Sequence, residues 1–81
     1  MVVKVLYFGQ LKELAGTTEE TVELREGARI EDLFAACAAA RPNLRKFRAS
    51  LVAACNQEFA GWDTRVQAGD EIGFLPPVSG G

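Results

Sequence analysis

The chain has 81 residues, of which 48% are apolar, and a formal net charge of −2. So short a chain can bury one core but not two, so residues 1–81 are predicted to form a single globular domain. The mixed, slightly acidic charge argues against nucleic-acid partners, and the absence of a run of about 18 apolar residues argues against a membrane span. The apolar stretch 2–8 is too short for a signal peptide, so a cytoplasmic location is expected.

The chain has two cysteines and no histidine. The usual zinc ligand sets and histidine-dependent triads are therefore missing, and we expect neither a resident metal nor a hydrolytic site. Cys37 falls on the apolar stripe of an expected helix, and Cys55 ends an expected buried strand. Both thiols are predicted to pack as small hydrophobic groups, since no neighbouring cation marks either one as a reactive thiolate.

The first half of the chain predicts strand, short helix, strand and long helix. Residues 2–8 are rich in β-branched and aromatic side chains, which is typical of a central strand covered over most of its length on both faces. Residues 10–15 have helical spacing and precede a glycine suited to a C-cap, and residues 21–24 alternate as a half-buried strand does. Residues 29–40 predict a helix that packs one face on a sheet, although no strong N-cap residue precedes it.

The sequence has one cluster of basic side chains, which lies in the segment 41–48 around Leu44 and Phe47 and comprises Arg41, Arg45, Lys46 and Arg48. Such a cluster could contact nucleic acid or an acidic partner. Four charges neutralise few phosphates, so we favour a solvated connector with Leu44 and Phe47 turned inward.

The second half of the chain predicts the remaining strands. Residues 51–55 suggest a buried strand, 56–58 a turn, and Phe59 with Trp62 a return along the sheet. Residues 71–75 form the last expected strand. The whole pattern predicts a two-layer α+β domain with one main helix across one face of the sheet.

The chain ends in Pro-Pro-Val-Ser-Gly-Gly, residues 76–81. Paired prolines favour an extended segment that projects from the domain, and paired glycines can pass through a narrow channel because they lack Cβ atoms. A terminal carboxylate is a poor electrophile until it is activated, typically as a mixed anhydride with a nucleotide phosphate. The tail is therefore predicted to enter another protein's active site, and the alternative is an ordinary frayed end.

Several segments together carry a resemblance to a known family: residues 3–8, 10–16, 56–57, 69–72 and 76–81. Over essentially its whole length the chain resembles the small, sulfur-carrying subunit of molybdopterin synthase, a family of ubiquitin-like proteins. The resemblance implies a ubiquitin-like β-grasp fold with a mixed sheet. The alanine-rich run 35–40 and the basic segment are not signatures of that family.

The resemblance also implies a function for Gly81. In such proteins an E1-like enzyme uses ATP to adenylate the last glycine, which is then converted to a thiocarboxylate. The tail enters the large synthase subunit, in a heterotetramer of two small and two large chains. There the sulfur attacks a cyclic pyranopterin precursor to build the dithiolene of molybdopterin. The chain itself would bind no cofactor.

The resemblance assigns a task to each residue of the tail. Gly81 would be the modified terminus and Gly80 a slender neck, and the docked extension would comprise Pro76, Pro77, Val78 and Ser79. An apolar surface for the partner would draw on Phe8, Phe59 and Leu75, for which ordinary core packing is the alternative.

Three other functions stay open. The chain could carry sulfur for thiazole synthesis or tRNA thiolation, although the Pro-Pro-Val-Ser stretch disfavours both. It could be a ubiquitin-like modifier joined to lysines through Gly81. It could also be a plain interaction domain in which the two terminal glycines are incidental.

Overall fold

A computed structural model describes residues 1–76 of the chain. Its elements are β1 (Val2–Tyr7), α1 (Gln10–Ala15), β2 (Glu19–Glu23), α2 (Ile30–Ala40), the 3-10 helix η1 (Pro42–Ser50), β3 (Val52–Cys55), β4 (Glu58–Ala60) and β5 (Glu71–Leu75). The predicted order of strands and helices is confirmed. The basic segment, predicted as a connector, is instead a 3-10 helix.

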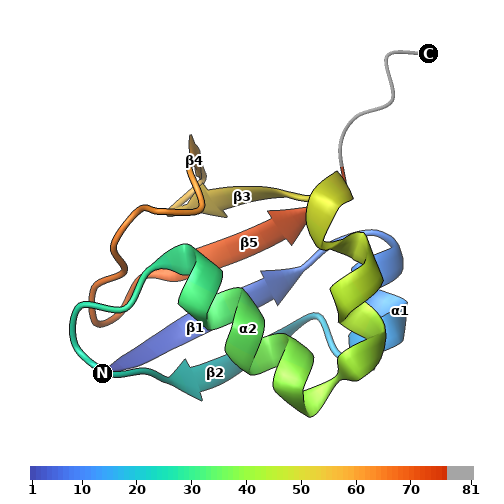
Figure 1. Cartoon of the computed structure of the whole chain (residues 1–81), viewed down its shortest axis with the longest axis horizontal. Coiled ribbons are helices and arrows are strands. Elements are labelled where there is room, and N and C mark those ends of the chain that lie inside the picture. Colours follow the sequence, from blue (N-terminus) through green and yellow to red (C-terminus); the bar gives the residue numbers. More distant parts are fainter. Residues whose placement is uncertain (77–81) are drawn as a thin grey trace.

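The five strands form one mixed sheet in the order β2-β1-β5-β3-β4. The first and last strands, β1 and β5, pair in parallel, and every other pair is antiparallel. Helix α2 lies across one face of this sheet, as the sequence predicts (Figure 1). The C-terminal end of β5 lies beside the end of β1 and the start of β3, because Tyr7 pairs with Phe74 and Val52 with Leu75.

The core lies between the sheet and α2. Val5 and Ile72 point toward the helix from the paired central strands and are fully buried, as are the helix residues Ile30 and Leu33. These positions follow the alternation of a strand and the stripe of an amphipathic helix. The buried apolar face of α2 is the one that the spacing of its apolar residues predicts.

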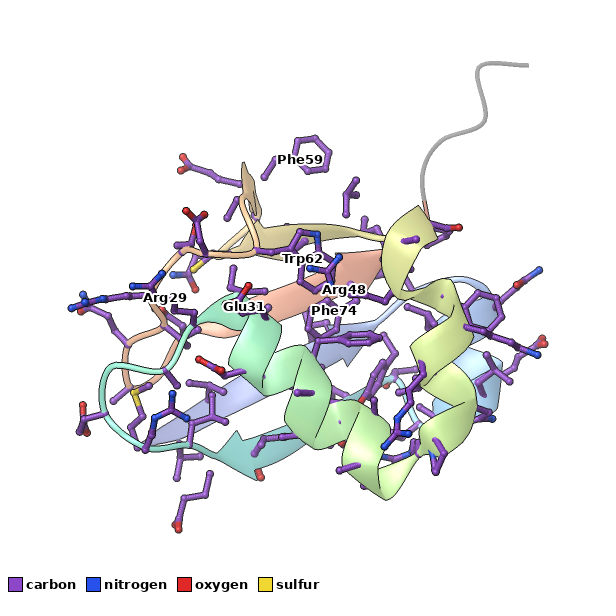
Figure 2. All side chains as sticks on the ribbon, viewed as in Figure 1. Arg29, Glu31, Arg48, Phe59, Trp62 and Phe74 are labelled. Carbon is purple, nitrogen blue, oxygen red and sulfur yellow. The ribbon has the colours of Figure 1, made fainter. Side chains whose placement is uncertain are left out.

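An aromatic cluster closes one side of the core. The Trp62 ring stacks on Phe74 with centroids 5.6 Å apart, and the edge of Phe34 meets both rings. The Arg48 guanidinium from η1 lies 3.5 Å from the centroid of Trp62. Figure 2 shows Arg48, Trp62 and Phe74 gathered between the helices and the sheet. A cation over an indole face is a favourable electrostatic contact, so η1 is attached to the core through this side chain.

A second polar anchor joins the opposite end of the basic segment to the sheet. The Arg41 guanidinium pairs with the Glu20 carboxylate at 2.9 Å, and its Nε donates to the carbonyl of Ala15 at 3.0 Å. The Tyr7 hydroxyl donates to Glu20 at 3.0 Å, and burial raises the pKa of Tyr7. The segment is therefore held at both ends. Leu44 is buried, as predicted, and Phe47 is partly buried.

Helix α2 is capped by a side chain of its own first turn and not by the residue that precedes it. Arg29 has no side-chain oxygen, but its backbone N–H donates to the Asp32 carboxylate at 2.8 Å. This hydrogen bond satisfies the backbone N–H of Arg29, the residue that precedes the helix, as the acidic residue of a capping box does. The helix thus begins where its apolar stripe begins, at Ile30.

Two predictions about strand burial are wrong. The stretch 2–8 is covered on one face only: Val3, Val5 and Tyr7 are buried, whereas Phe8 is 42% exposed. Residues 51–55 are not a fully buried strand either. Val52 is exposed and Cys55 is half-buried. Both errors have one cause, because the helices cover only one face of the sheet and an apolar side chain on the other face gives the same sequence signal.

Candidate functional site

An apolar hollow lies on the face of the sheet opposite α2. It is lined by Leu6, Phe8, Ala54, Gln57, Phe59, Glu71, Gly73 and Leu75. These side chains come from four strands and the turns beside them, at the alternate positions to those that fill the core. The three residues predicted for an apolar surface, Phe8, Phe59 and Leu75, are brought together here. Phe8 and Phe59 are exposed, and Leu75 is half-buried.

Gly73 forms the floor of the hollow beneath Phe8. A Cβ atom at Gly73 would lie 2.9 Å from Cε2 of Phe8, closer than side chains approach one another. The aromatic ring therefore lies flat against the bare backbone of β5. Gly73 is a residue that the sequence interpretation missed. A glycine inside an otherwise apolar strand is a usable signal, because it often marks a place where another group approaches closely.

Phe59 is carried by a tight hairpin. Asn56 and Gln57 have φ angles of 51° and 73°, the positive pair that a two-residue hairpin requires. Their turn sets Phe59 opposite Ala54 across the β3–β4 ladder. The side chain is 79% exposed, and Figure 2 shows it standing away from the helices.

Asn56 fastens this hairpin to the start of β5. Its side-chain carbonyl accepts from the N–H of Glu71 at 3.0 Å, and its amide donates to the Asp70 carboxylate at 3.0 Å. Asp70 also accepts from the N–H of Gln67 at 2.8 Å. The Gln67 N–H and the Asn56 amide together lower the pKa of Asp70, because both stabilise its ionised form. The hairpin that presents Phe59 is thereby fixed to the strand that carries Leu75.

The open face changes character along β1. Lys4 lies between two carboxylates, 3.2 Å from Glu19 and 3.9 Å from Glu71, at the end distant from the tail. Leu6 and Phe8 follow at the other end and line the hollow. The residues of this stretch that line the hollow are therefore those at the end where β5 finishes.

The tail begins beside the hollow. Leu75 lines it, and the exposed Pro76 is the next residue. The predicted site residues Pro77, Val78, Ser79, Gly80 and Gly81 lie outside the described residues.

Neither cysteine is in a setting that activates a thiol. Cys37 is 2% exposed, and burial raises its pKa, so its predicted packing role is confirmed. Cys55 is half-buried and its thiol donates to Asp70 at 3.6 Å. Partial burial and then the nearby carboxylate raise its pKa as well. A thiol held in its neutral form is a poor nucleophile.

Within residues 1–76, no three His, Cys, Asp or Glu side chains converge on a point that could hold a metal ion. Across the same part of the chain, no helix has the length and apolar character needed to cross a membrane.

The sheet order, the parallel pairing of the first and last strands and the helix across one face define a ubiquitin-like β-grasp protein. The ThiS family model matches residues 5–81, so the chain belongs to the ThiS family. The predicted family and fold are therefore confirmed.

Similar proteins include both sulfur carriers and a protein modifier. The molybdopterin synthase sulfur carrier subunit of Chlamydomonas reinhardtii is 43% identical, with all of both chains covered. The crystal structure of SAMP1 from Haloferax volcanii matches with a TM-score of 0.87 and 29% identity, again over all of both chains. A chain in the complex of subunits 1 and 2 of the Helicobacter pylori molybdopterin-converting factor matches with a TM-score of 0.69 and 26% identity over the full length of both.

Proposed function

We propose that this chain is the sulfur carrier subunit of a molybdopterin synthase, and that the carboxyl group of Gly81 carries the sulfur atom. The observation that carries the proposal is the position of the apolar hollow beside the start of the tail. Leu75 belongs to the hollow, and only residues 76–81 separate it from the terminal carboxylate. The active site of a partner that binds the hollow would thus need to lie only a few residues' length from the hollow to accept the terminal carboxylate. The full-length similarity to the sulfur carrier subunit of C. reinhardtii supports the same function.

The proposed chemistry begins with activation of the Gly81 carboxylate. An E1-like enzyme joins it to the α-phosphate of ATP and releases pyrophosphate. A sulfur nucleophile then displaces AMP and leaves a thiocarboxylate. This group stays ionised at neutral pH, so it is a competent nucleophile, whereas the original carboxylate is unreactive.

The large synthase subunit would supply the substrate pocket and the acid and base groups. The thiocarboxylate sulfur attacks the cyclic pyranopterin precursor to form a thioester. Water then cleaves the acyl carbon–sulfur bond, which leaves the sulfur on the pterin and releases the chain with its Gly81 carboxylate. Two such transfers complete the dithiolene of molybdopterin. Gly80 would serve as the neck in the channel, with Pro76, Pro77, Val78 and Ser79 as the docked extension. We propose a heterotetramer of two small and two large chains in the cytoplasm. The complex of subunits 1 and 2 from H. pylori, which contains a similar chain, supports a large-subunit partner.

Phe8, Phe59 and Leu75 would form the docking surface for the large subunit. Exposed apolar side chains gathered in a hollow are typical of a protein contact. Aromatic residues also contribute strongly to such contacts when they become buried. The charged end of the same face, around Lys4, would lie outside this contact.

Intact-protein mass spectrometry tests the chemistry. The chain is incubated with ATP, the adenylating enzyme and a sulfur source. The expected product is heavier by the difference between one sulfur and one oxygen atom. A chain that lacks Gly81 is the control and should not change. The large subunit should then convert the precursor pterin only with the thiocarboxylated chain. No mass change in the presence of a demonstrably active enzyme would overturn the proposal.

A second function is favoured by one observation, the similarity to SAMP1, a small archaeal modifier protein of Haloferax volcanii. In that function Gly81 forms an amide with lysine side chains of other proteins through the same adenylate. Adducts of the chain on protein lysines, in place of the thiocarboxylate, would support it. Thiazole synthesis or tRNA thiolation would instead be indicated by sulfur transfer without any activity toward the pterin.

A further inference from the structure

Gly9, at the turn between β1 and α1, has a backbone conformation suited to glycine. Its φ is 58° and its ψ is −133°, where a residue with a Cβ atom is strained. Its carbonyl accepts from the N–H of Lys12 at 3.1 Å, and the carbonyl of Phe8 accepts from Leu11 at 3.1 Å. The turn is thus closed by the first bonds of α1, and Gly9 has little freedom to move.

The space that a side chain of residue 9 would occupy faces the base of the tail. A Cβ atom at Gly9 would lie 3.3 Å from Cγ and 3.7 Å from Cδ of Pro76. The contact follows from the parallel pairing of β1 with β5, in which Tyr7 stands opposite Phe74. Two residues further along the same register, Gly9 comes opposite Pro76. Proline has no N–H with which to continue the ladder, so its ring packs on the bare glycine instead.

The contact constrains the last described residue of the chain. The proline ring already fixes φ of Pro76, and it disfavours helical geometry at Leu75. The orientation of the ring then depends on ψ of Leu75, and a Cβ atom at Gly9 would crowd the ring in its present place. The hollow lies on the same segment, since Phe8 and Leu75 line it. One stretch of β1 therefore shapes both the docking hollow and the start of the tail.

We infer that Gly9 is a positioning residue for the base of the C-terminal tail: its missing side chain leaves the space beside which the Pro76 ring packs, and so fixes where Pro76 stands relative to the hollow. The effect on activity rests on the proposed function, because a partner that binds the hollow needs the terminal group of Gly81 at a defined position in its active site. Displacement of a reacting group by about 1 Å can lower a rate by about 10²-fold. A small shift at Pro76 is thus expected to affect chemistry more than docking.

The decisive comparison uses two glycine substitutions, of which Gly9→Ala carries the greater backbone strain, because Gly9 has a ψ of −133° whereas Gly16, with a ψ of 12°, lies in the left-handed helical region. Gly9→Ala places a Cβ atom at φ 58° and against Pro76, whereas Gly16→Ala places one at φ 75° with nothing within 4 Å. The two glycines flank the same helix, α1. Both variants should lose stability, Gly9→Ala more than Gly16→Ala, which thermal unfolding measures. Only Gly9→Ala should affect the tail.

Two readouts follow the tail in the full chain. In two-dimensional NMR spectra, Gly9→Ala should shift the amide signals of residues 78–81, and Gly16→Ala should leave them unchanged. In conversion of the precursor pterin by the large synthase subunit with the thiocarboxylated chain, Gly9→Ala should lower the turnover number about tenfold or more while KM stays within about twofold, because the docking hollow is intact. Equal shifts and equal turnover for the two variants would overturn the inference.

A double-mutant cycle with Pro76→Ala tests the contact itself. In the Pro76→Ala background the ring is gone, so Gly9→Ala should lower turnover much less than in the unmodified chain. The same factor in both backgrounds would overturn the inference. Should Gly9→Ala fail to fold, Pro76→Ala alone tests the inference, because Pro76 is exposed and its replacement should leave the fold intact. The amide signals of Gly9 and Gln10 should shift if the Pro76 ring packs beside Gly9, and unchanged signals would overturn the inference. A chain that is never adenylated refutes the proposed function, and the NMR comparison still decides the role of Gly9.

Discussion

The two faces of β5 differ in what they do. Ile72 and Phe74 point toward α2 and are fully buried, whereas Gly73 and Leu75 point to the open face and shape the hollow. One strand thus serves the core and the candidate docking surface through alternate residues. The comparison indicates that stability and partner contact can be changed separately in this chain, by substitutions only one residue apart.

The largest expected effect is on the core face. Phe74→Ala should lower the free energy of unfolding by about 3–5 kcal/mol, because it leaves a cavity under Trp62 and Phe34. Phe59→Ala removes the same side chain from an exposed position and should change it by less than about 0.5 kcal/mol. Urea unfolding followed by Trp62 fluorescence measures both. Similar losses for the two variants would contradict the division between the faces.

Gly73→Ala sharpens the comparison within one residue of Phe74. A Cβ atom at this position meets the Phe8 ring at 2.9 Å, so the ring must turn away and the floor of the hollow must rise. Overpacking of this kind typically costs about 1–3 kcal/mol. The cost should largely vanish when Phe8→Ala is added, which a double-mutant cycle of unfolding free energies measures. Additive losses would show that Phe8 does not cover Gly73 in solution.

The sequence predicted the helix-covered face well and the open face poorly, for a physical reason. The spacing of Ile30, Leu33 and Phe34 identifies a helix face whatever it contacts. By contrast, an apolar residue in a strand gives the same signal whether a helix or a partner protein covers it. Phe8 and Phe59 therefore stayed undecided between core and surface. Contacts between distant residues, such as Arg41 with Glu20 and Gly9 with Pro76, depend on strand register, which local patterns do not specify.

Leu75→Glu should weaken binding to the large synthase subunit about tenfold or more, because it places a charge in an apolar contact at the base of the tail. Val2→Glu is the matched control. Val2 begins β1, at the end away from Phe8 and the hollow, and it is 51% exposed. Isothermal titration calorimetry with the large subunit compares the two affinities. Equal affinities would place the docking surface elsewhere on the chain.

The smallest expected effect concerns pH. Hydrogen bonds from the Gln67 N–H and the Asn56 amide hold the pKa of Asp70 below its usual range. A depressed folded pKa means that Asp70 contributes stability above its unfolded pKa and loses that contribution as the pH falls through the folded pKa. Asp70→Asn should therefore flatten the acidic limb of the stability curve and leave its slope near neutral pH unchanged, as unfolding at a series of pH values would measure. Because Asp70 bonds to Asn56 of the β3–β4 hairpin, the variant should also loosen the support of Phe59 while the aromatic cluster around Phe74 stays in place. An unchanged acidic limb would mean that carboxylates other than Asp70 govern the acid sensitivity of the fold.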